Sequence, residues 1–436
     1  MRDVDGSAKV TADHALVTQY GNAVKDCLFI VGAGREQEHA FEVARELNLD
    51  IVASDRDEAA PMRASADYFL AASTFDAEAT ARAAEHFSAS VRPISGVMTI
   101  ANDCAPTVAA VAERLGLQGI RREIAELSRN KWAFKQLLEA SNICSPIGAV
   151  TKSLVDLASV ARDIPGDRLI VKPVSGRGAE GVALVAKGDA ERLQVCWRFA
   201  QEIDPGHEVL VEEFVSGVQL STESFVQRGK VYTPILCERN YSRIEQFSPA
   251  IIEDGGTIPA LLSPLEEERV RALLARVVEV LEITDGVLKG DLVVGPRGIC
   301  VLEVALRLSG GWFASDQIRI ASGVDLVKAV VLQAIGREVP EIDLVPSLNR
   351  STAIRYWFPE AGKIVAIDGL ENVARAKGVE RVDISRSVGD MLGSIRSHRD
   401  RFGSVLCSGE TRDEAVDNAH RALQCLSIET TGETNV

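Results

Sequence analysis

A hairpin pattern in the second half of the chain restricts its fold more than any other feature. In KGDLVVGPRGICVLEVALRL, residues 289–308, two apolar runs flank the sequence GPRG, which favours a tight turn. Pairing about this turn brings Asp291 opposite residue 302 or 303 of the second strand. Because side chains alternate along a strand, Glu303, Ala305 and Arg307 share one face. The pattern therefore predicts two carboxylates facing each other across a hairpin, with an arginine beyond them.

Two such carboxylates suit Mg²⁺, with Mn²⁺ as an alternative. Mg²⁺ takes one or two protein carboxylates and completes its shell with phosphate oxygens and water. Asp291 and Glu303 are therefore the predicted metal ligands, although either acid alone is typical of a solvated strand residue. A guanidinium can grip a transferring phosphoryl group as a fork, so Arg307 is the predicted catalytic cation.

A glycine-rich motif, LIVKPVSGRGAEGV at residues 169–182, follows an apolar run that ends at Lys172. Small residues let backbone N–H groups approach a polyphosphate, and a nearby lysine neutralises it as a point charge. A flexible hairpin turn is the alternative interpretation of this loop when it is taken alone. The candidate phosphate-binding residues of the loop, residues 175–181, are Ser175, Gly176, Gly178 and Gly181.

A further segment, VLVEEFVSGVQLS, provides a strand with two acids, Glu212 and Glu213, followed by apolar residues. Backbone donors and acceptors with apolar flanks are what an adenine ring needs between two sheets. The chain thus carries a lysine, a glycine loop, an acid pair and an arginine in this order. This order favours a site for a magnesium-bound triphosphate.

The composition limits the class of protein. The chain has 436 residues, with 48 Lys and Arg against 63 Asp and Glu, a formal net charge of −15. This charge argues against a nucleic-acid scaffold, and no apolar run approaches the roughly 20 residues of a membrane span. The eight cysteines are scattered without metal-ligand spacing, and no secretory signal precedes them. We expect free thiols in a cytoplasmic protein that binds neither membrane nor nucleic acid.

Changes in the pattern of predicted strands and helices along the sequence indicate three units after a polar leader at residues 1–26. Residues 27–125 alternate strands such as CLFIVGAG and LDIVASD with helices, which predicts an α/β domain with a parallel sheet. Residues 126–340 are richer in strands and hairpins and predict a larger α+β domain. Residues 341–436 predict a small C-terminal subdomain that acts as a cap.

Another glycine signal, VGAGRE, follows the first predicted strand. A dinucleotide-binding fold would place a third glycine at the position of Gln37. The missing glycine favours a tight strand-to-helix turn, with NAD binding near Gly32 and Gly34 as the alternative.

These residues together resemble the ATP-grasp superfamily over nearly the whole chain, in the order of its carboxylate–amine ligases, relatives of D-alanine–D-alanine ligase, L-amino-acid ligases and biotin carboxylase. The resemblance implies an ATP-grasp fold with an N-terminal Rossmann-like (pre-ATP-grasp) domain. RNKWAFKQLL carries over Lys131 as a first phosphate-contacting lysine, and LIVKP supplies Lys172 as the second. VEEFVSG resembles the hinge at which Glu212 meets the adenine amino group and Val215 offers a backbone contact.

The resemblance implies further site residues. Phe214 belongs to the same hinge, and Gln219 takes the place of a ribose-binding glutamate. LEVALRLSGG resembles the metal strand and a substrate loop, but Ala305 stands where many members have asparagine. The candidate substrate residues are Ser309, Gly310, Gly311, Arg239 and Asn102, the last beside Asp103 at the end of a strand.

The function implied is an ADP-forming ligase that joins an amino-acid-like carboxylate to an amine through an acyl phosphate. Its partners would be ATP, a small acid, a small amine and a second copy of the chain in a homodimer. Three alternatives stay open at this point: a bicarbonate-using carboxylase, an ATP-binding regulator with impaired catalysis, suggested by Ala305 and Gln219, and the dehydrogenase.

Overall fold

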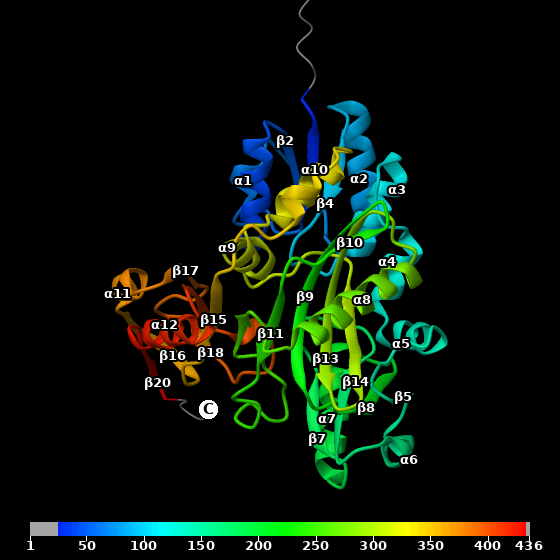
Figure 1. The fold of residues 1–436 in the computed structure, drawn as a ribbon, viewed down its shortest axis with the longest axis vertical. Coiled ribbons are helices and arrows are strands. Elements are labelled where there is room, and N and C mark those ends of the chain that lie inside the picture. Colours follow the sequence, from blue (N-terminus) through cyan, green and yellow to red (C-terminus); the bar gives the residue numbers. More distant parts are fainter. Residues whose placement is uncertain (1–24, 433–436) are drawn as a thin grey trace, which may run out of the picture.

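The N-terminal domain is built around β1 (Cys27–Val31), whose side chains are all buried. The structure, a computed structural model, describes residues 25–432, so the predicted leader at 1–26 lies almost wholly outside the described residues. β1 pairs in parallel with β2 and β4, and β2 pairs in parallel with β3, which confirms the parallel sheet predicted here. The other elements of this domain are β2 (Asp50–Asp55), β3 (Tyr68–Ala71), β4 (Gly96–Met98), α1 (Glu38–Glu46), α2 (Ala77–Ser90) and α3 (Ala105–Leu115) (Figure 1).

The turn after β1 is held by a buried glutamine rather than shaped by a third glycine. Gln37 ends the short helix Arg35–Gln37, and its Oε1 accepts a hydrogen bond from the backbone N–H of Ile100 (3.0 Å). Gly32 has a φ of +109°, and a side chain there would collide with the Asn102 amide. The turn therefore ties the end of β1 to the end of β4, as expected for a tight strand-to-helix connection.

A small four-stranded sheet carries the glycine loop. Its strand order is β5-β8-β6-β7, and β6 pairs antiparallel with β7, as the hairpin pattern around LIVKP predicts. α6 and α7 pack against it through one apolar cluster. The elements are β5 (Gly148–Thr151), β6 (Arg168–Pro173), β7 (Ala183–Ala186), β8 (Val209–Glu213), α6 (Leu154–Asp163) and α7 (Ala190–Ile203), preceded by α4 (Arg122–Arg129) and α5 (Lys131–Ala140).

The largest sheet runs through the central and C-terminal regions in the order β14-β13-β9-β11-β12-β15-β19-β17, with β10 beside β9. α8 (Pro264–Val280) packs against its central strands through Val270, Leu274 and Val277. The strands are β9 (Val218–Gln227), β10 (Lys230–Tyr232), β11 (Leu236–Asn240), β12 (Gly255–Ile258), β13 (Gly286–Gly295), β14 (Gly298–Ala305), β15 (Ser351–Trp357), β17 (Val379–Ile384) and β19 (Gly403–Gly409).

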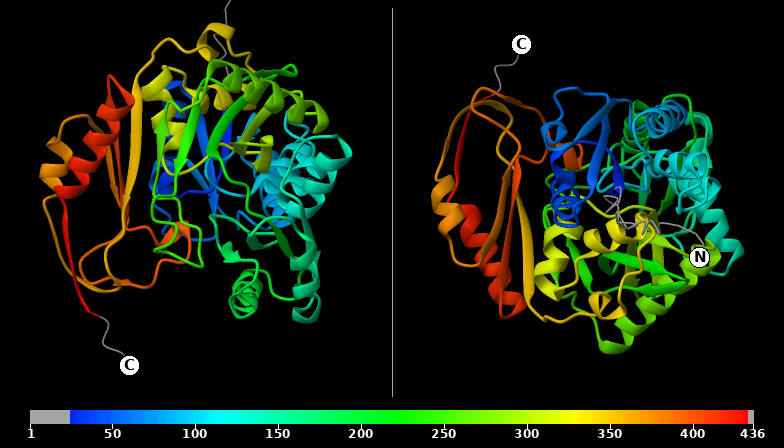
Figure 2. Two further views of the ribbon diagram at one scale, coloured as in Figure 1. Left: turned by 60° about the horizontal axis from the view of Figure 1, so that its bottom comes forward. Right: turned by 90° about the horizontal axis from the view of Figure 1, so that it is seen from above.

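The C-terminal region is less separate than the predicted cap. β12 pairs with β15, so the strands of the C-terminal lobe continue the central sheet, while the lobe projects to one side of the molecule (Figures 1 and 2). Residues 355–431 also contribute a second small sheet and two helices, α11 (Leu370–Arg375) and α12 (Arg412–Gln424). That sheet consists of β16 (Gly362–Asp368), β18 (Met391–Leu392) and β20 (Ser427–Thr431).

The chain returns to the N-terminal domain before entering the C-terminal lobe. After a π-helical turn at Phe313–Gln317 and α9 (Ile318–Ser322), α10 (Leu326–Ala334) packs against α1 and β4 (Figure 1). Val327 and Val331 of α10 share an apolar cluster with Leu28 and Ile30 of β1. This helix precedes the predicted boundary at residue 340, yet its side chains complete the N-terminal core because they are apolar enough to cover that sheet.

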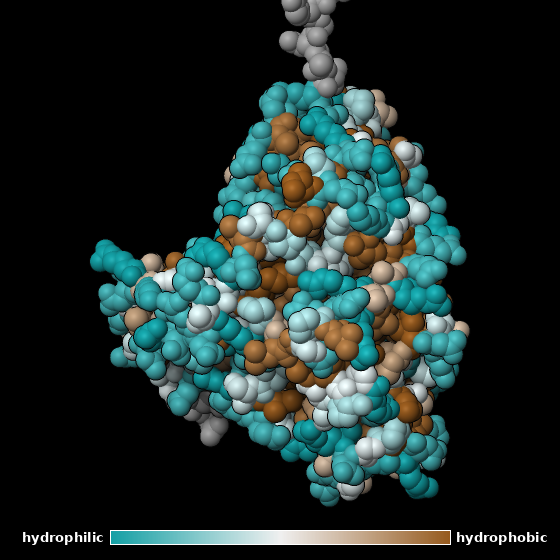
Figure 3. All heavy atoms as spheres, viewed as in Figure 1, coloured by the Kyte–Doolittle hydropathy of each residue, from teal (hydrophilic) through white to brown (hydrophobic). Residues whose placement is uncertain are grey.

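The face seen in Figure 3 is mostly hydrophilic, most uniformly over the projecting C-terminal lobe, with apolar side chains dispersed among polar ones. Within residues 25–432, none of the helices combines the length and apolar character that crossing a bilayer requires.

The contact between β4 and the end of α10 yields a test of this domain arrangement. A Cβ on Gly96 would lie within 2.9 Å of three backbone atoms of residues 334–335. We expect Gly96→Ala to lower the free energy of unfolding by about 1–3 kcal/mol, the usual cost of overpacking, in urea denaturation. Gly188→Ala is the matched control, because no heavy atom lies within 4 Å of its Cβ position. Equal stability of both variants would contradict the close contact.

Candidate active site

One cavity of about 670 Å³ lies where the small sheet, the large sheet and both flanking domains meet. It brings together nearly all of the residues that the sequence singled out. The predicted residues that line it are Asn102, Lys131, Lys172, Gly176, Gly178, Glu212, Glu213, Phe214, Val215, Gln219, Arg239, Asp291, Glu303, Arg307, Ser309, Gly310 and Gly311.

Two predicted loop residues stand outside this cavity. Ser175 lines a smaller pocket of about 260 Å³ next to it, together with Glu303, Ala305 and Arg307. Gly181 packs on α7, where a Cβ would lie 3.2 Å from the carbonyl oxygen of Phe199, and its φ is +70°. The structure therefore gives Gly181 a packing role against α7, because only a residue without a side chain fits there.

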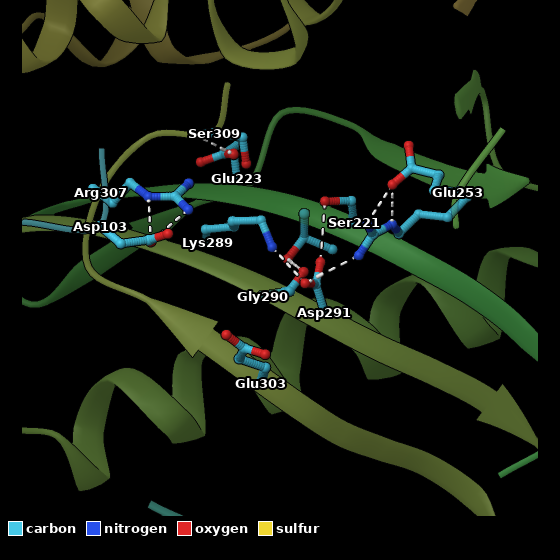
Figure 4. A network of polar contacts seen from close by, with 12 residues as sticks. Asp103, Ser221, Glu223, Glu253, Lys289, Gly290, Asp291, Glu303, Arg307 and Ser309 are labelled. Carbon is cyan, nitrogen blue, oxygen red and sulfur yellow. Dashed lines mark hydrogen bonds and ion pairs between the residues drawn. The ribbon is translucent and has the colours of Figure 1, made fainter. Parts of the chain in front are cut away.

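The structure decides between the two registers that the hairpin pattern leaves open, residue 302 or residue 303 opposite Asp291. Asp291 of β13 lies opposite Glu303 of β14, with a bulge immediately after Asp291. Lys289 Nζ (2.5 Å) and the Ser221 hydroxyl (3.2 Å) contact the Asp291 carboxylate (Figure 4). Arg239 Nη1 lies 3.1 Å from the same carboxylate. Burial alone would raise the pKa of Asp291, but Lys289 and Arg239 outweigh it and lower the pKa to about 2. Asp291 is therefore a carboxylate throughout the neutral range.

The chemistry of this pair fits a magnesium ion held by few protein ligands. Glu303 lies on the neighbouring strand, apart from the Asp291 cluster (Figure 4). Lys131 Nζ lies 3.5 Å from its carboxylate. Among residues 25–432, no group of three or more histidine, cysteine or acidic side chains could hold a metal ion. Ala305, at the position of the common asparagine, adds no ligand. Two carboxylates remain, which is what Mg²⁺ bound mainly by phosphate requires.

Arg307 is held against the N-terminal domain. Its Nε and Nη2 donate to Oδ1 of Asp103 at 2.9 and 2.6 Å (Figure 4). Burial lowers the pKa of Arg307, but Asp103 outweighs this and raises it above the ordinary value. The arginine is therefore a permanent cation whose position depends on the strand end that carries Asp103.

A buried charge cluster joins the glycine-loop lysine to the adenine segment. Both Lys172 and Lys135 form ion pairs with Glu212, the latter at 3.0 Å, and all three side chains are buried. Burial raises the pKa of Glu212, but the two lysines outweigh it and the pKa falls below its usual value. The Glu212 carboxylate, expected to meet an adenine amino group, thus already serves to neutralise two buried cations.

Lys135 did not emerge from the sequence as a site residue. It follows Lys131 by four positions in RNKWAFKQLL, and residues at this spacing share one helix face. This spacing is the feature of the sequence that indicates Lys135 as a site residue beside Lys131. Lys131, at the start of α5, donates from Nζ to the Gly176 carbonyl oxygen (3.0 Å) and so links the helix to the glycine loop.

The opposite wall of the cavity comes from β11, β12 and the C-terminal lobe. Arg239 forms an ion pair with Glu253, and Arg401 Nη2 donates to the Glu253 carbonyl oxygen (2.7 Å). The Arg401 guanidinium lies 3.8 Å from the ring centroid of Tyr356. His398 also lines this wall. No local pattern marks Arg401, Tyr356 or His398 as site residues, because they reach the cavity through the continuation of the sheet beyond β12.

One carboxylate in the cavity differs from the rest. Every acidic side chain that lines it, except Glu36, lies within ion-pair distance of a lysine or arginine among residues 25–432. Glu36 instead accepts a hydrogen bond from the backbone N–H of Gly311. Burial raises the pKa of Glu36 more than this hydrogen bond and Arg307 lower it. A positively charged group on a ligand would give the Glu36 carboxylate an ion-pair partner.

The Glu212 cluster predicts a pH-dependent contribution to stability. We expect Glu212→Gln to lower the free energy of unfolding at pH 7 by about 3–5 kcal/mol, because it leaves two buried cations unpaired. Since folding lowers the pKa of Glu212, its contribution is present above the ordinary value of 4.5 and is lost as the pH falls through the lower, folded value. Denaturant melts from pH 7 to pH 3 measure this.

Glu208→Gln is the control for that experiment, because Glu208 pairs with the exposed Lys152 (3.3 Å) on the same small sheet. It should change stability by less than about 1 kcal/mol. A Glu212→Gln variant as stable as Glu208→Gln at pH 7 would show that the cluster does not hold these charges.

Comparison with known proteins matches three segments of the chain to family models. An ATP-grasp N-terminal domain matches residues 41–119, an ATP-grasp domain matches 128–311, and L-amino acid ligase C-terminal domain 2 matches 355–431. The middle segment includes Lys131, Lys172, Asp291, Glu303 and Arg307.

Individual relatives are more distant. The uncharacterized protein y4rH of Sinorhizobium fredii is 26% identical over 336 residues, which cover 76% of this chain and 68% of that protein. Carnosine synthase 1 of Gallus gallus is 26% identical over 431 residues, 93% of this chain but 45% of that protein. The chain thus spans about half the length of this second relative.

The fold is also shared with solved structures. The crystal structure of L-amino acid ligase from Bacillus licheniformis superposes with a TM-score of 0.79 at 21% identity, covering 94% of this chain and 99% of that one. The matched segments account for the N-terminal domain, the cavity and the C-terminal lobe in their order along the chain. The chain belongs to the ATP-grasp superfamily, and its C-terminal lobe matches the second C-terminal domain of L-amino acid ligases.

Proposed function

We propose that this protein is an ADP-forming ligase that joins the carboxylate of an amino acid to an amine through an acyl phosphate. The observation that carries the proposal is the convergence of Lys131, Lys172, Asp291, Glu303 and Arg307 on one cavity. Cations suited to phosphate oxygens, two carboxylates suited to a divalent metal and a fixed guanidinium are the groups that phosphoryl transfer requires.

The first chemical step activates a poor electrophile. A carboxylate oxygen attacks the γ-phosphorus of ATP, the bond to the β,γ-bridging oxygen breaks, and ADP leaves with that electron pair. Lys131 and Lys172 neutralise the phosphate chain, and Arg307 meets the charge that develops on the transferring group. Mg²⁺, with Mn²⁺ as a substitute, would be held by Asp291 and Glu303 and supplies charge neutralisation to the phosphate oxygens.

The second step forms the amide. The amine attacks the acyl carbon, and the tetrahedral oxyanion is stabilised by Arg307 or by the backbone N–H groups of Ser309–Gly311. Phosphate then leaves with its electron pair, and the nitrogen loses a proton. Water that reached the acyl phosphate would hydrolyse it, so the glycine loop at 175–181 must cover this part of the cavity.

The unpaired Glu36 supports an amino acid as the acid substrate. An α-ammonium group would supply the positive charge that this carboxylate lacks, beside the Gly310–Gly311 backbone. The names of relatives agree with such chemistry, since carnosine synthase and L-amino acid ligase are named for products or substrates that contain amino acids.

The proposal is tested by incubating the purified protein with Mg-ATP and pairs of amino acids and amines. We expect ADP, phosphate and an amide in equal amounts, measured by chromatography and mass spectrometry. Lys172→Met should lower kcat/KM for ATP by about 100-fold or more, because a cation that neutralises the phosphate chain is lost, and this variant excludes contaminating ATPases.

Other outcomes of this assay separate the remaining functions. Formation of AMP and pyrophosphate would contradict the mechanism. ATP turnover that depends on bicarbonate would favour the carboxylase. Tight binding of ATP without turnover of any pair would favour the regulator, to which the missing ligand at Ala305 points.

The proposed role of Glu36 gives a separate prediction. Glu36→Gln should raise KM for the amino acid that donates its carboxylate by about tenfold or more, the typical value of a charge-assisted hydrogen bond, and leave KM for ATP unchanged. The same acid without its α-amino group should be an equally poor substrate for both proteins. An equal rise of both KM values in the variant would contradict a specific contact with the ammonium group.

A further inference from the structure

Residues 396–401 of the C-terminal lobe, here called the latch segment, extend from the lobe to the central cavity. The segment lies between β18 and β19 and includes the short helix His398–Asp400 (Figure 2). Ser397 and Asp400 form a capping box that fixes its conformation. Arg396 anchors it to α7 through an ion pair with Glu202 (2.6 Å). The segment therefore contacts α7, a helix that packs on the small sheet carrying the glycine loop.

The latch segment binds the glycine loop directly. The backbone N–H of His398 donates to the carbonyl oxygen of Gly178 (3.0 Å). Arg399 Nη1 lies 3.2 Å from Oε1 of Glu180. Both partners belong to the loop at 175–181, and both line the cavity. One backbone and one side-chain contact thus join the C-terminal lobe to the loop that must exclude water.

The same segment also contacts the opposite wall of the cavity. Arg401 donates to the carbonyl oxygen of Glu253, and the backbone N–H of Glu253 donates to Nε2 of His398 (3.4 Å). Glu253 is the ion-pair partner of Arg239 on that wall. The segment therefore connects the glycine loop, a candidate phosphate-binding element, to the wall that carries the candidate substrate residue Arg239.

The loop needs such an anchor because its own sequence gives it little rigidity. Gly178 and Ala179 both have a positive φ, and Gly176, Gly178 and Gly181 lose much conformational freedom on ordering. On its other side, the guanidinium of Arg177 lies 4.1 Å from the ring centroid of Phe75 in the N-terminal domain. Contacts to both flanking domains thus hold the loop in place.

We propose that the latch segment holds the glycine loop closed over the phosphates, with Arg399 as a positioning residue that acts through Glu180. This inference rests on the proposed function for its catalytic consequence, but the loop contacts are independent of it. Breaking the latch leaves Lys172, Asp291 and Arg307 in place and lets water reach the acyl phosphate. The amount of ADP released per amide formed then rises.

Hydrogen–deuterium exchange of the peptide that covers residues 175–182 tests the latch on the full chain without substrates. Arg399→Glu should accelerate exchange in this peptide by about two- to fivefold or more, because the ion pair that limits opening is replaced by repulsion. Glu180→Arg should do the same. The double variant Arg399→Glu/Glu180→Arg reverses the pair and should restore exchange toward the wild-type rate.

Arg375→Glu is the matched control, since Arg375 pairs with Glu371 on the exposed helix α11 of the same lobe (3.1 Å). It should leave exchange in residues 175–182 unchanged. In the ligase assay, Arg399→Glu should raise the ratio of ADP to amide at least about threefold, and the double variant should lower it again.

The outcomes for the latch and for the proposed function are distinguishable. Wild-type exchange in Arg399→Glu, or a double variant that exchanges faster than either single variant, would overturn the latch. If the wild-type protein forms no amide from any pair, the ligase proposal fails, while the exchange measurements still decide whether the segment closes the loop.

Discussion

The site depends on burying many charged groups while leaving almost none unpaired. Lys172, Lys135 and Glu212 neutralise one another inside the small sheet, and Asp291 is surrounded by Lys289, Arg239 and Ser221. A single buried ion without a partner would cost several kcal/mol, so these groups can coexist only in the arrangement that pairs them. The cavity is thus organised before a nucleotide arrives, which lowers the reorganisation needed when an anionic substrate replaces part of this pairing.

This arrangement requires distant parts of the chain to meet. Asp103 comes from the N-terminal domain and Arg307 from the segment that follows β14. Arg401 comes from the C-terminal lobe, which reaches the site because β12 pairs with β15. Because α10 packs in the N-terminal core, it fixes the position of the N-terminal domain relative to the large sheet. The glycine loop, which has the least structure of its own, lies between them and receives contacts from both flanking domains.

Local sequence patterns predicted much of the fold and many of the site residues. The features that they did not predict depend on pairing between distant parts of the chain. The GPRG turn was sufficient to place Asp291 opposite residue 302 or 303, because a short turn restricts the register of a hairpin. The bulge after Asp291, which no local pattern marked, selects Glu303. Alternating strands and helices were sufficient to predict the parallel N-terminal sheet. The roles of Asp103, Lys135, His398 and Arg401 depend on partners far away in sequence or on helix faces that residue types alone do not identify. The continuity of the large sheet into the C-terminal lobe was missed for the same reason, since no local signal marks which edge strand pairs with β15.

The central claim is that this cavity transfers the γ-phosphoryl group of ATP to a carboxylate before any amine reacts. Positional isotope exchange tests it most directly: ATP labelled with ¹⁸O in the β,γ-bridge is incubated with Mg²⁺, the protein and the unmodified amino acid that donates its carboxylate, while the acceptor amine is omitted. Reversible formation of an acyl phosphate predicts that the label moves from the bridge to non-bridging positions of the β-phosphate, and only when the carboxylate is present. Recovery of ATP with its label still in the bridge, under conditions in which the complete mixture forms amide, would contradict the account.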